Sequence, residues 1–195
     1  MSRFNQKAQE WDLSSMRQSI AQNAYNAIIN NIDLDKEDSV IDFGAGTGLL
    51  SKKIALHVKE LLAIDSSEKM LQKLDELHIK NIQTLHQDIS KFQTDKKFNG
   101  IVSSMTMHHI KDLDILFDKL YQLLDENGYI AIIDLMSEDG SFHTDNEGVH
   151  HFGFSEKDLT KLVKKHNFKD IKYTKIYTVT KENRQYDIFL LSAKK

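Results

Sequence analysis

The order of apolar runs and turns along this 195-residue chain predicts an α/β fold with a doubly wound, mostly parallel sheet of seven strands. Helices on both faces would make it a three-layer α/β/α domain. Five short apolar runs alternate with segments of helical periodicity, which is typical of repeated strand–helix–strand units. Two runs rich in aromatic and β-branched residues then follow, joined by the polar turn 181–184, which indicates a C-terminal antiparallel hairpin. The length fits a single domain, residues 1–195.

A glycine-dense turn follows the first predicted strand, at residues 40–43. Gly44, Gly46 and Gly48 can adopt positive φ and let a ligand approach the backbone. The helix start after them presents N–H groups that favour a carboxylate or phosphate. A dinucleotide G-x-G-x-x-G fingerprint counted from Gly44 would need a third glycine at the position of Leu49. The turn therefore predicts a ligand site of another kind, with a ligand-free tight turn as the alternative.

The helices on either side of this turn have clear apolar stripes. Residues 15–31 predict a helix that precedes the strand. Its stripe consists of Ile20, Ala24, Ala27 and Ile28. The helix after the turn has a stripe of Leu50, Ile54, Ala55 and Val58.

Residues 61–65 predict a second buried strand that ends in Asp65. This carboxylate lies 21 residues after Gly44, close to the spacing at which an acidic residue accepts hydrogen bonds from ribose hydroxyls. A third strand is expected at 82–88 and a fourth at 98–104. The helix between the second and third strands has an inward stripe of Leu71, Leu74 and Leu77.

The strongest helical periodicity covers residues 112–125, and Asn127 with Gly128 ends this helix. Its stripe comprises Leu113, Leu116, Phe117, Leu120, Leu123 and Leu124. Residues 129–134 predict the fifth strand, and Ser155 begins a last helix with a capping box. The inward residues of that helix are Leu159, Leu162, Val163 and His166. One face of the first hairpin strand should carry Ile171, Tyr173, Tyr177 and Val179.

Four motifs resemble class I S-adenosylmethionine-dependent methyltransferases, which have a Rossmann-like fold, and the resemblance covers essentially the whole chain. They are D-x-G-x-G-x-G at 42–48, D-x-S-x-x-M-L at 65–71, F-x-x-x-A-x-x-W-D at 4–12 and H-H-I-x-D at 108–112. The last motif is similar to the small-molecule branch that contains the ubiquinone and menaquinone biosynthesis enzymes (methyltransferase types 11 and 12). Residues 126–128 depart from the Pro-Gly-Gly that the family usually has there.

The resemblance implies S-adenosylmethionine as the cofactor, S-adenosylhomocysteine as the product, and a helical segment at 1–31 that lies across the cofactor cleft. Asp65 would bind the ribose, Asp88 the adenine amino group, and the glycine loop the methionine end. The implied cofactor set is Asp42, Gly44, Ala45, Gly46, Gly48, Asp65, Ser66, Met70, Asp88, Ile89 and Ser104. The resemblance implies that Trp11 and Met105 face the substrate, and Phe152 is expected to face it as part of the long loop described below. Trp11 and Met70 are interpreted equally well as packing side chains.

Independently of the resemblance, polar residues end the predicted parallel strands. Because the carboxyl ends of parallel strands share one edge of the sheet, where ligands bind, we expect these side chains to converge. They are Asp42, Asp65, Asp88, Ser104 and Asp134.

Histidines are the candidate general bases if the acceptor is a hydroxyl, because the pKa of imidazole lies near neutrality. The candidates are His109, His151, His150, His108 and His143. Each also has a structural interpretation, as a side chain that bridges backbone groups. No metal site is predicted, because the chain has no cysteine and the histidine spacings match no common zinc pattern; a zinc site formed by the same histidines is the disfavoured alternative.

Residues 137–154 form a loop longer than most loops in compact domains. We expect a lid over the acceptor pocket, in which Phe142, Phe152 and Phe154 exclude water. At most one of the adjacent His150 and His151 would face the cleft directly if the backbone is extended. The alternative is a structural loop whose histidines cap backbone groups.

The bulk properties narrow the classes of partner. A formal net charge of -3 and the lack of a Pro-Pro-aromatic element after the fourth strand argue against a nucleic-acid substrate and favour a small molecule. No apolar run is long enough to span a membrane and no signal peptide is evident, so a cytoplasmic protein is expected, with monomer and homodimer both open. Two other functions stay open: a nucleotide-cofactor oxidoreductase, which Leu49 disfavours, and a methyltransferase-like module that binds the cofactor without catalysis.

Overall fold

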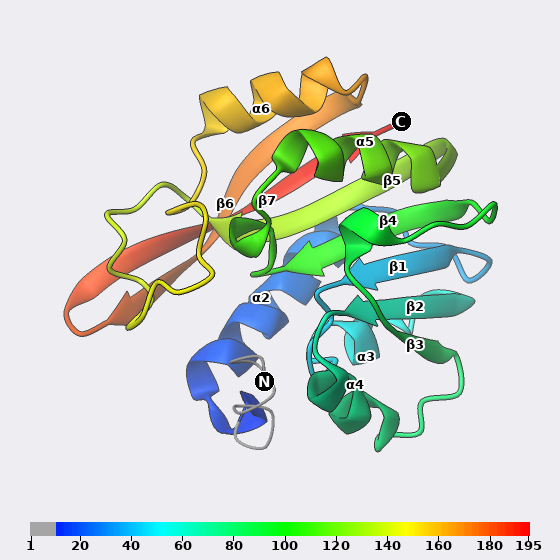
Figure 1. The fold of residues 1–195 in the computed structure, drawn as a ribbon, viewed down its shortest axis with the longest axis horizontal. Coiled ribbons are helices and arrows are strands. Elements are labelled where there is room, and N and C mark those ends of the chain that lie inside the picture. Colours follow the sequence, from blue (N-terminus) through cyan, green and yellow to red (C-terminus); the bar gives the residue numbers. More distant parts are fainter. Residues whose placement is uncertain (1–10) are drawn as a thin grey trace.

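The computed structural model describes residues 11–195, which form one seven-stranded sheet with helices on both sides (Figure 1). The strands lie in the order β3-β2-β1-β4-β5-β7-β6. β1 to β5 pair in parallel, and β7 is antiparallel to both β5 and β6, which confirms the predicted fold class. The strands are β1 (Ser39–Phe43), β2 (Glu60–Asp65), β3 (Ile82–His86), β4 (Phe98–Ser104), β5 (Leu124–Leu135), β6 (Lys169–Lys181) and β7 (Arg184–Lys194).

One α-helix precedes β1 and the others connect the strands; of the short 3-10 segments, one precedes the first α-helix and two follow the ends of β3 and β4. The α-helices are α2 (Ser15–Asn31), α3 (Ser51–Ile54), α4 (Glu68–Asp75), α5 (Leu113–Leu123) and α6 (Glu156–Lys165). The 3-10 segments are η1 (Trp11–Leu13), η2 (Ile89–Lys91) and η3 (Met107–His109). Within residues 11–195, no helix is both long and apolar enough to cross a lipid bilayer.

Two hydrophobic clusters, one on each face of the sheet, hold the three layers together. Ile28 of α2 and Ile54 of α3 belong to the first cluster, and Phe117 of α5 belongs to the second. Successive side chains of a strand point to opposite faces, so Val40 packs in the first cluster and Ile41 in the second. Strand β1, an interior strand of the sheet, is buried along its whole length.

Three helices end earlier than their apolar stripes predicted. α3 has only four residues, because the chain must turn to enter β2 at Glu60. α4 ends at Asp75, and His78 adopts a positive φ, which leaves Leu77 46% exposed instead of inward. α5 ends at Leu123, since the next residue already pairs with β4, and the expected stop at Asn127 lies within β5 at a register shift.

The predicted single face of β6 is wrong. Ile171 and Tyr173 pack against the second cluster, whereas Tyr177 packs against the first and Val179 belongs to it. The pairing of β6 with β7 shifts register between Lys175 and the residue two positions later. A bulge adds one residue to the strand, and one residue is enough to invert the side-chain alternation.

Candidate functional site

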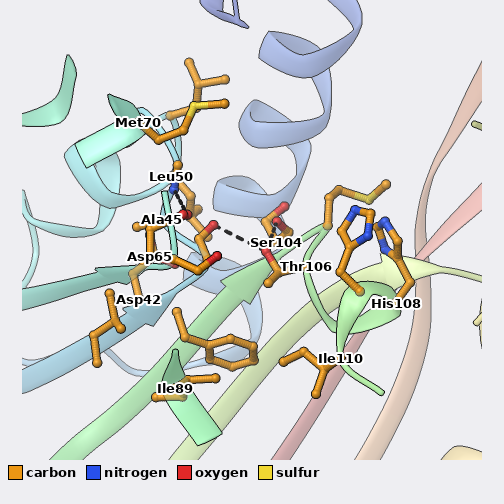
Figure 2. Close-up of a pocket in the computed structure, with 18 of the residues that line it drawn as sticks. Asp42, Ala45, Leu50, Asp65, Met70, Ile89, Ser104, Thr106, His108 and Ile110 are labelled. Atoms are coloured by element: carbon orange, nitrogen blue, oxygen red, sulfur yellow. Dashed lines mark hydrogen bonds between the residues drawn. The ribbon is translucent and has the colours of Figure 1, made fainter. Parts of the chain in front are cut away.

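A cavity of about 700 Å³ opens at the carboxyl ends of β1, β2 and β4. The strand order reverses beside β1, and such a switch point is where open α/β sheets bind ligands. The volume falls in the range of small-molecule sites, about 300–1,000 Å³. Figure 2 shows Asp42 and Asp65 on one side of the cavity and His108 on the other, with Ser104 and Thr106 between them.

The three glycines of the turn after β1 all have positive φ, but only one borders open space. A Cβ at Gly44 would lie 2.2 Å from the side chain of Thr106, and a Cβ at Gly48 would lie 2.3 Å from Leu74. A Cβ at Gly46, whose φ is +56°, would meet no atom of residues 11–195 within 4 Å. Gly44 and Gly48 therefore allow close packing, and Gly46 exposes its backbone to the cavity.

Asp65, the last residue of β2, fixes the conformation of this glycine turn. Its Oδ2 accepts a hydrogen bond from the backbone N–H of Gly46 at 2.8 Å, and its Oδ1 accepts one from the N–H of Ser67 at 2.7 Å. Burial raises the pKa of Asp65, and these two hydrogen bonds oppose the shift. A carboxylate has about four acceptor positions, so each oxygen can accept one more hydrogen bond, for example from the two hydroxyls of a ribose.

Asp42 is a second carboxylate at this end, and it is only 1% exposed. Its Oδ2 accepts a hydrogen bond from the hydroxyl of Ser51 at 2.5 Å. Burial raises its pKa to about 7; the bond from Ser51 lowers it, and the charge of Asp65 raises it further. The ionised form of Asp42 would be favoured by a cationic group in the cavity.

η1 and the start of α2 cover the glycine turn. The hydroxyl of Thr47 donates to the carboxylate of Asp12, and the guanidinium of Arg17 lies 3.8 Å from the ring centroid of Trp11. Burial lowers the pKa of Arg17, and the charge of Asp12 opposes this effect. Trp11 and Arg17 both line the cavity. The first part of the predicted N-terminal motif, residues 4–10, lies outside the described residues.

At the opposite end of the cavity, a buried carboxylate orients His108. Oδ1 of Asp134, in β5, accepts a hydrogen bond from Nδ1 of His108 at 2.7 Å and another from the N–H of Leu135 at 2.7 Å. Its Oδ2 accepts the backbone N–H of His108 at 3.1 Å. Both side chains are almost fully buried. Because the carboxylate can only accept, Nδ1 of a neutral His108 carries the proton and Nε2 carries the lone pair.

Two further imidazoles meet His108. Nε2 of His143 lies 3.1 Å from Nε2 of His108, so His143 donates this hydrogen bond and its Nδ1 is the basic nitrogen. Nδ1 of His109 donates to the carbonyl oxygen of Gly148 at 2.7 Å, which places the lone pair of a neutral ring on Nε2. The three ring centroids are 4.1 to 5.6 Å apart. We refer to His108, His109 and His143 as the histidine cluster.

The loop 137–154 is anchored where it contributes to the cavity. The backbone N–H groups of His150 and His151 both donate to the carbonyl oxygen of His108, at 2.9 and 3.2 Å. Nζ of Lys181, at the end of β6, donates to the carbonyl oxygen of Phe142 at 2.9 Å. These contacts hold the middle of the loop against η3, so the loop forms the wall behind the histidine cluster.

The structure brings most of the sequence-predicted residues to one cavity. Those that line it are Trp11, Asp42, Gly44, Ala45, Gly46, Asp65, Ser66, Met70, Asp88, Ile89, Ser104, Met105, His108, His109, His143 and His150. Met70 both lines the cavity and packs in the core, where it is only 1% exposed. Its position is therefore compatible with a contact to the cofactor and with a packing role. Asp88 also caps η2, because its Oδ1 accepts the N–H of Ser90 at 2.9 Å.

Five residues predicted at the site do not line the cavity: Gly48, Asp134, His151, Phe152 and Phe154. Asp134 instead supports His108 through a hydrogen bond. Gly48 packs against α4, as its contact with Leu74 shows. Nε2 of His151 donates to the carbonyl oxygen of Ile110 at 2.9 Å, and its ring lies 5.3 Å from that of Phe154. Phe152 is 45% exposed and lies over Gly140, outside the cavity. The loop backbone turns at Gly153, whose φ is +73°, and that turn aims Phe152 away from the site while Phe154 enters the core.

Other cavity residues were not predicted from the sequence. Thr106 donates to the carbonyl oxygen of Gly44 at 3.3 Å and so connects the two ends of the cavity. Lys181 reaches the cavity from the end of β6. Phe142, by contrast, is one of the predicted lid residues, and it does line the cavity. Asp134 is evident in the sequence as a polar strand end, but its pairing with His108 spans 26 residues. No spacing rule in the sequence signals contacts of this kind.

Comparison with known proteins identifies the family. The model of the methyltransferase domain matches residues 14–173. An uncharacterized methyltransferase of Schizosaccharomyces pombe is 30% identical over 156 residues, which cover 70% of this chain and 55% of that protein. The chain therefore spans about half the length of this relative.

Solved structures show the same fold. A methyltransferase of Haloferax volcanii, solved in complex with the activator Trm112, has a TM-score of 0.84 at 12% identity, covering 100% of this chain and 98% of that chain. Phosphoethanolamine N-methyltransferase 2 of Haemonchus contortus, solved in complex with S-adenosyl-L-methionine, has a TM-score of 0.74 at 16% identity, covering 89% of this chain and 52% of that chain.

Proposed function

Because this chain belongs to the class I S-adenosylmethionine-dependent methyltransferases, we propose that it transfers a methyl group to a hydroxyl group of a small-molecule acceptor. The observation that carries the proposal is a single cavity with a carboxylate-lined glycine turn at one end and a histidine cluster at the other. Because the chain belongs to this family, the alternative function of a nucleotide-cofactor oxidoreductase is not favoured.

The residues at the glycine turn fit the cofactor. Gly46 has no side chain and faces open space, and the oxygens of Asp65 have acceptor positions for the two ribose hydroxyls. A nearby positive charge would stabilise the ionised form of the buried Asp42. Asp42 therefore suits the methionine end of the cofactor, which carries an ammonium and a sulfonium. When bound, S-adenosylmethionine supplies the electrophilic methyl group.

The histidine cluster fits the acceptor end. An acceptor hydroxyl must lose its proton, and an imidazole has a pKa suited to receive it. A proton taken up at Nδ1 of His143 shifts positive charge along the hydrogen bond to His108, where the carboxylate of Asp134 stabilises it. This is the logic by which a carboxylate supports a histidine base in other enzymes. Trp11 and Phe142 limit the access of water, and the walls align the acceptor for in-line transfer.

Two measurements test this function. Calorimetry should show binding of S-adenosylhomocysteine, and Asp65→Ala should weaken it by about 1–3 kcal/mol, because the ribose hydroxyls lose their acceptor. Asp75→Ala is the matched control, since that carboxylate lies at the end of α4 and bonds the hydroxyl of Thr84. Metabolite extracts incubated with methyl-labelled cofactor should then yield a labelled small molecule.

Two results would contradict the proposal. Equal S-adenosylhomocysteine affinity in folded Asp65→Ala and Asp75→Ala proteins would remove the ribose assignment. Label found only in nucleic acid or protein would remove the small-molecule acceptor, and cofactor binding with no labelled product from any extract would favour a binding module without catalysis.

A further inference from the structure

The histidine cluster brings three imidazole nitrogens to one point. One ring nitrogen from each of His108, His109 and His143 lies within 4.8 Å of the other two. Two of these residues are adjacent in η3, and the third comes from the loop after β5. All three residues line the cavity.

The partners of these rings prepare two of the nitrogens as metal ligands. Nδ1–H of His108 is bound by the carboxylate of Asp134 at 2.7 Å, and Nδ1–H of His109 by the carbonyl of Gly148 at 2.7 Å. Metal-binding histidines almost always donate their other ring N–H to a carboxylate or a backbone carbonyl, which fixes the tautomer and makes the ligand nitrogen more basic. Both His108 and His109 show this arrangement.

The spacing of the nitrogens suits a metal ion after a small movement. Nε2 of His108 and Nε2 of His143 are 3.1 Å apart, joined by a single proton. Two nitrogens bound tetrahedrally at the usual Zn–N length of about 2.0–2.1 Å are roughly 3.3 Å apart. A cation can therefore replace that proton with little change in this pair, and the separation of up to 4.8 Å within the cluster would have to shorten when the ion binds.

We propose that His108, His109 and His143 bind one divalent first-row transition metal ion, for which zinc is the reference occupant. Neutral imidazoles suit zinc, copper, nickel and iron and do not suit magnesium or calcium. Three protein ligands leave an open coordination position, as in catalytic zinc sites. Since the three histidines line the cavity, a fourth ligand would come from it.

The open position defines the class of acceptor, and this step rests on the proposed function. An oxygen bound to such an ion loses its proton near neutral pH, because the ion lowers the pKa of a bound water to about 7. The acceptor would therefore carry a hydroxyl that coordinates the metal through oxygen. In the metal-loaded protein His143 would act on the acceptor's proton through the ion that it helps to hold, and the proton would leave to solvent; without the ion, His143 would take up the proton directly.

Metal uptake by the unliganded protein is the test. The untagged chain is stripped with a chelator, dialysed, and titrated with Co²⁺ while the visible absorption is recorded, and then with Zn²⁺ in a calorimeter. We expect one ion per chain and the intense visible bands of four-coordinate Co²⁺, displaced by Zn²⁺. Asp134→Asn should weaken Zn²⁺ binding by about 10–100-fold, the usual effect of losing a carboxylate that supports a ligand histidine.

The ligand variants are chosen to keep the fold. His109 and His143 are less buried than His108, so His109→Ala and His143→Ala should remain folded and should weaken metal binding at least as much as Asp134→Asn. His150→Ala is the matched control, because it removes a cavity histidine outside the cluster. Melting temperature and S-adenosylhomocysteine affinity verify that each variant retains its structure.

Two results would overturn the metal site: no saturable uptake of Co²⁺ or Zn²⁺ by the stripped protein, or uptake that His109→Ala and His143→Ala leave unchanged. Methyl transfer by a protein that binds no metal would refute this inference and leave the proposed function intact. Metal uptake without any methyl transfer would support the metal site and contradict the proposed function.

Discussion

The two ends of the cavity are built in different ways. The cofactor end consists of backbone groups and carboxylates from a short stretch of chain, such as the hydrogen bond from Gly46 to Asp65, 19 residues apart. The acceptor end consists of side chains that contact one another across longer separations, such as His108 with Asp134 and with His143, 35 residues away. A local motif can be shared by many proteins that bind one cofactor, whereas an end assembled from distant side chains can differ with each acceptor.

The electrostatics of the two ends also differ. Asp42 and Asp65 are carboxylates whose pKa values burial raises, so this end gains from a positively charged ligand. The acceptor end consists of imidazoles and the buried Asp134, which together can receive a proton or a cation. Substitutions at the cofactor end should therefore change cofactor affinity, and substitutions at the acceptor end should change turnover.

His143→Ala should give the largest effect. We expect turnover at saturating cofactor to fall by about 10²–10⁴-fold, the range for loss of a group that handles the acceptor's proton. S-adenosylhomocysteine affinity, measured by calorimetry, should be unchanged, because His143 acts at the acceptor end. A parallel loss of cofactor affinity would show that the two ends are not separate.

Asp42→Asn should change the pH dependence of stability. The pKa of Asp42 is raised from 3.8 to about 7 in the folded protein, so the folded state holds more protons than the unfolded state between these values. The unfolding free energy of the wild type should therefore fall as pH rises from about 4 to about 7, by up to about 4 kcal/mol at 1.36 kcal/mol per pKa unit. The asparagine side chain of the variant does not titrate, so the variant should gain stability over the wild type as pH rises.

Urea denaturation at pH 5 and pH 8, without cofactor, measures this difference. If the unfolding free energies of Asp42→Asn and wild type differ by the same amount at both pH values, ionisation of Asp42 does not destabilise the folded state. Cofactor affinity should be weaker in the variant at pH 8, since the charge that attracts a cationic ligand is lost. Turnover of the bound complex tests whether the change is confined to the cofactor end.

His151→Ala should give the smallest effect. The ring donates one hydrogen bond to Ile110 and lies outside the cavity, so its loss should cost about 1 kcal/mol. For a chain of this length that corresponds to a melting temperature lower by about 2–4 °C. Turnover should be unchanged. If turnover falls by more than the loss of folded protein explains, His151 contributes to the acceptor site after all.

The positions of most elements and the cofactor end could be predicted from the sequence, because the signals are local. Hydrophobic periodicity depends on neighbouring residues, so β4 and α2 have the predicted bounds. Ser155 is the N-cap of α6, as predicted: its hydroxyl accepts the N–H of Asp158 and donates to the side chain of Asp158. The glycine turn and Asp65 lie within one strand–helix–strand unit, whose geometry is fixed by the right-handed crossover.

Only the tertiary structure decided the acceptor end. The cluster of His108, His109 and His143 exists because β4 and β5 are adjacent and parallel. Their carboxyl ends therefore lie side by side, and η3, which follows β4, meets the loop that follows β5. The pairing of Asp134 with His108 and the exclusion of Phe152 depend on the path of that loop. The bulge in β6 likewise follows from its pairing with β7. Contacts between residues far apart in the chain are set by packing and strand register, for which a single sequence contains no periodic signal.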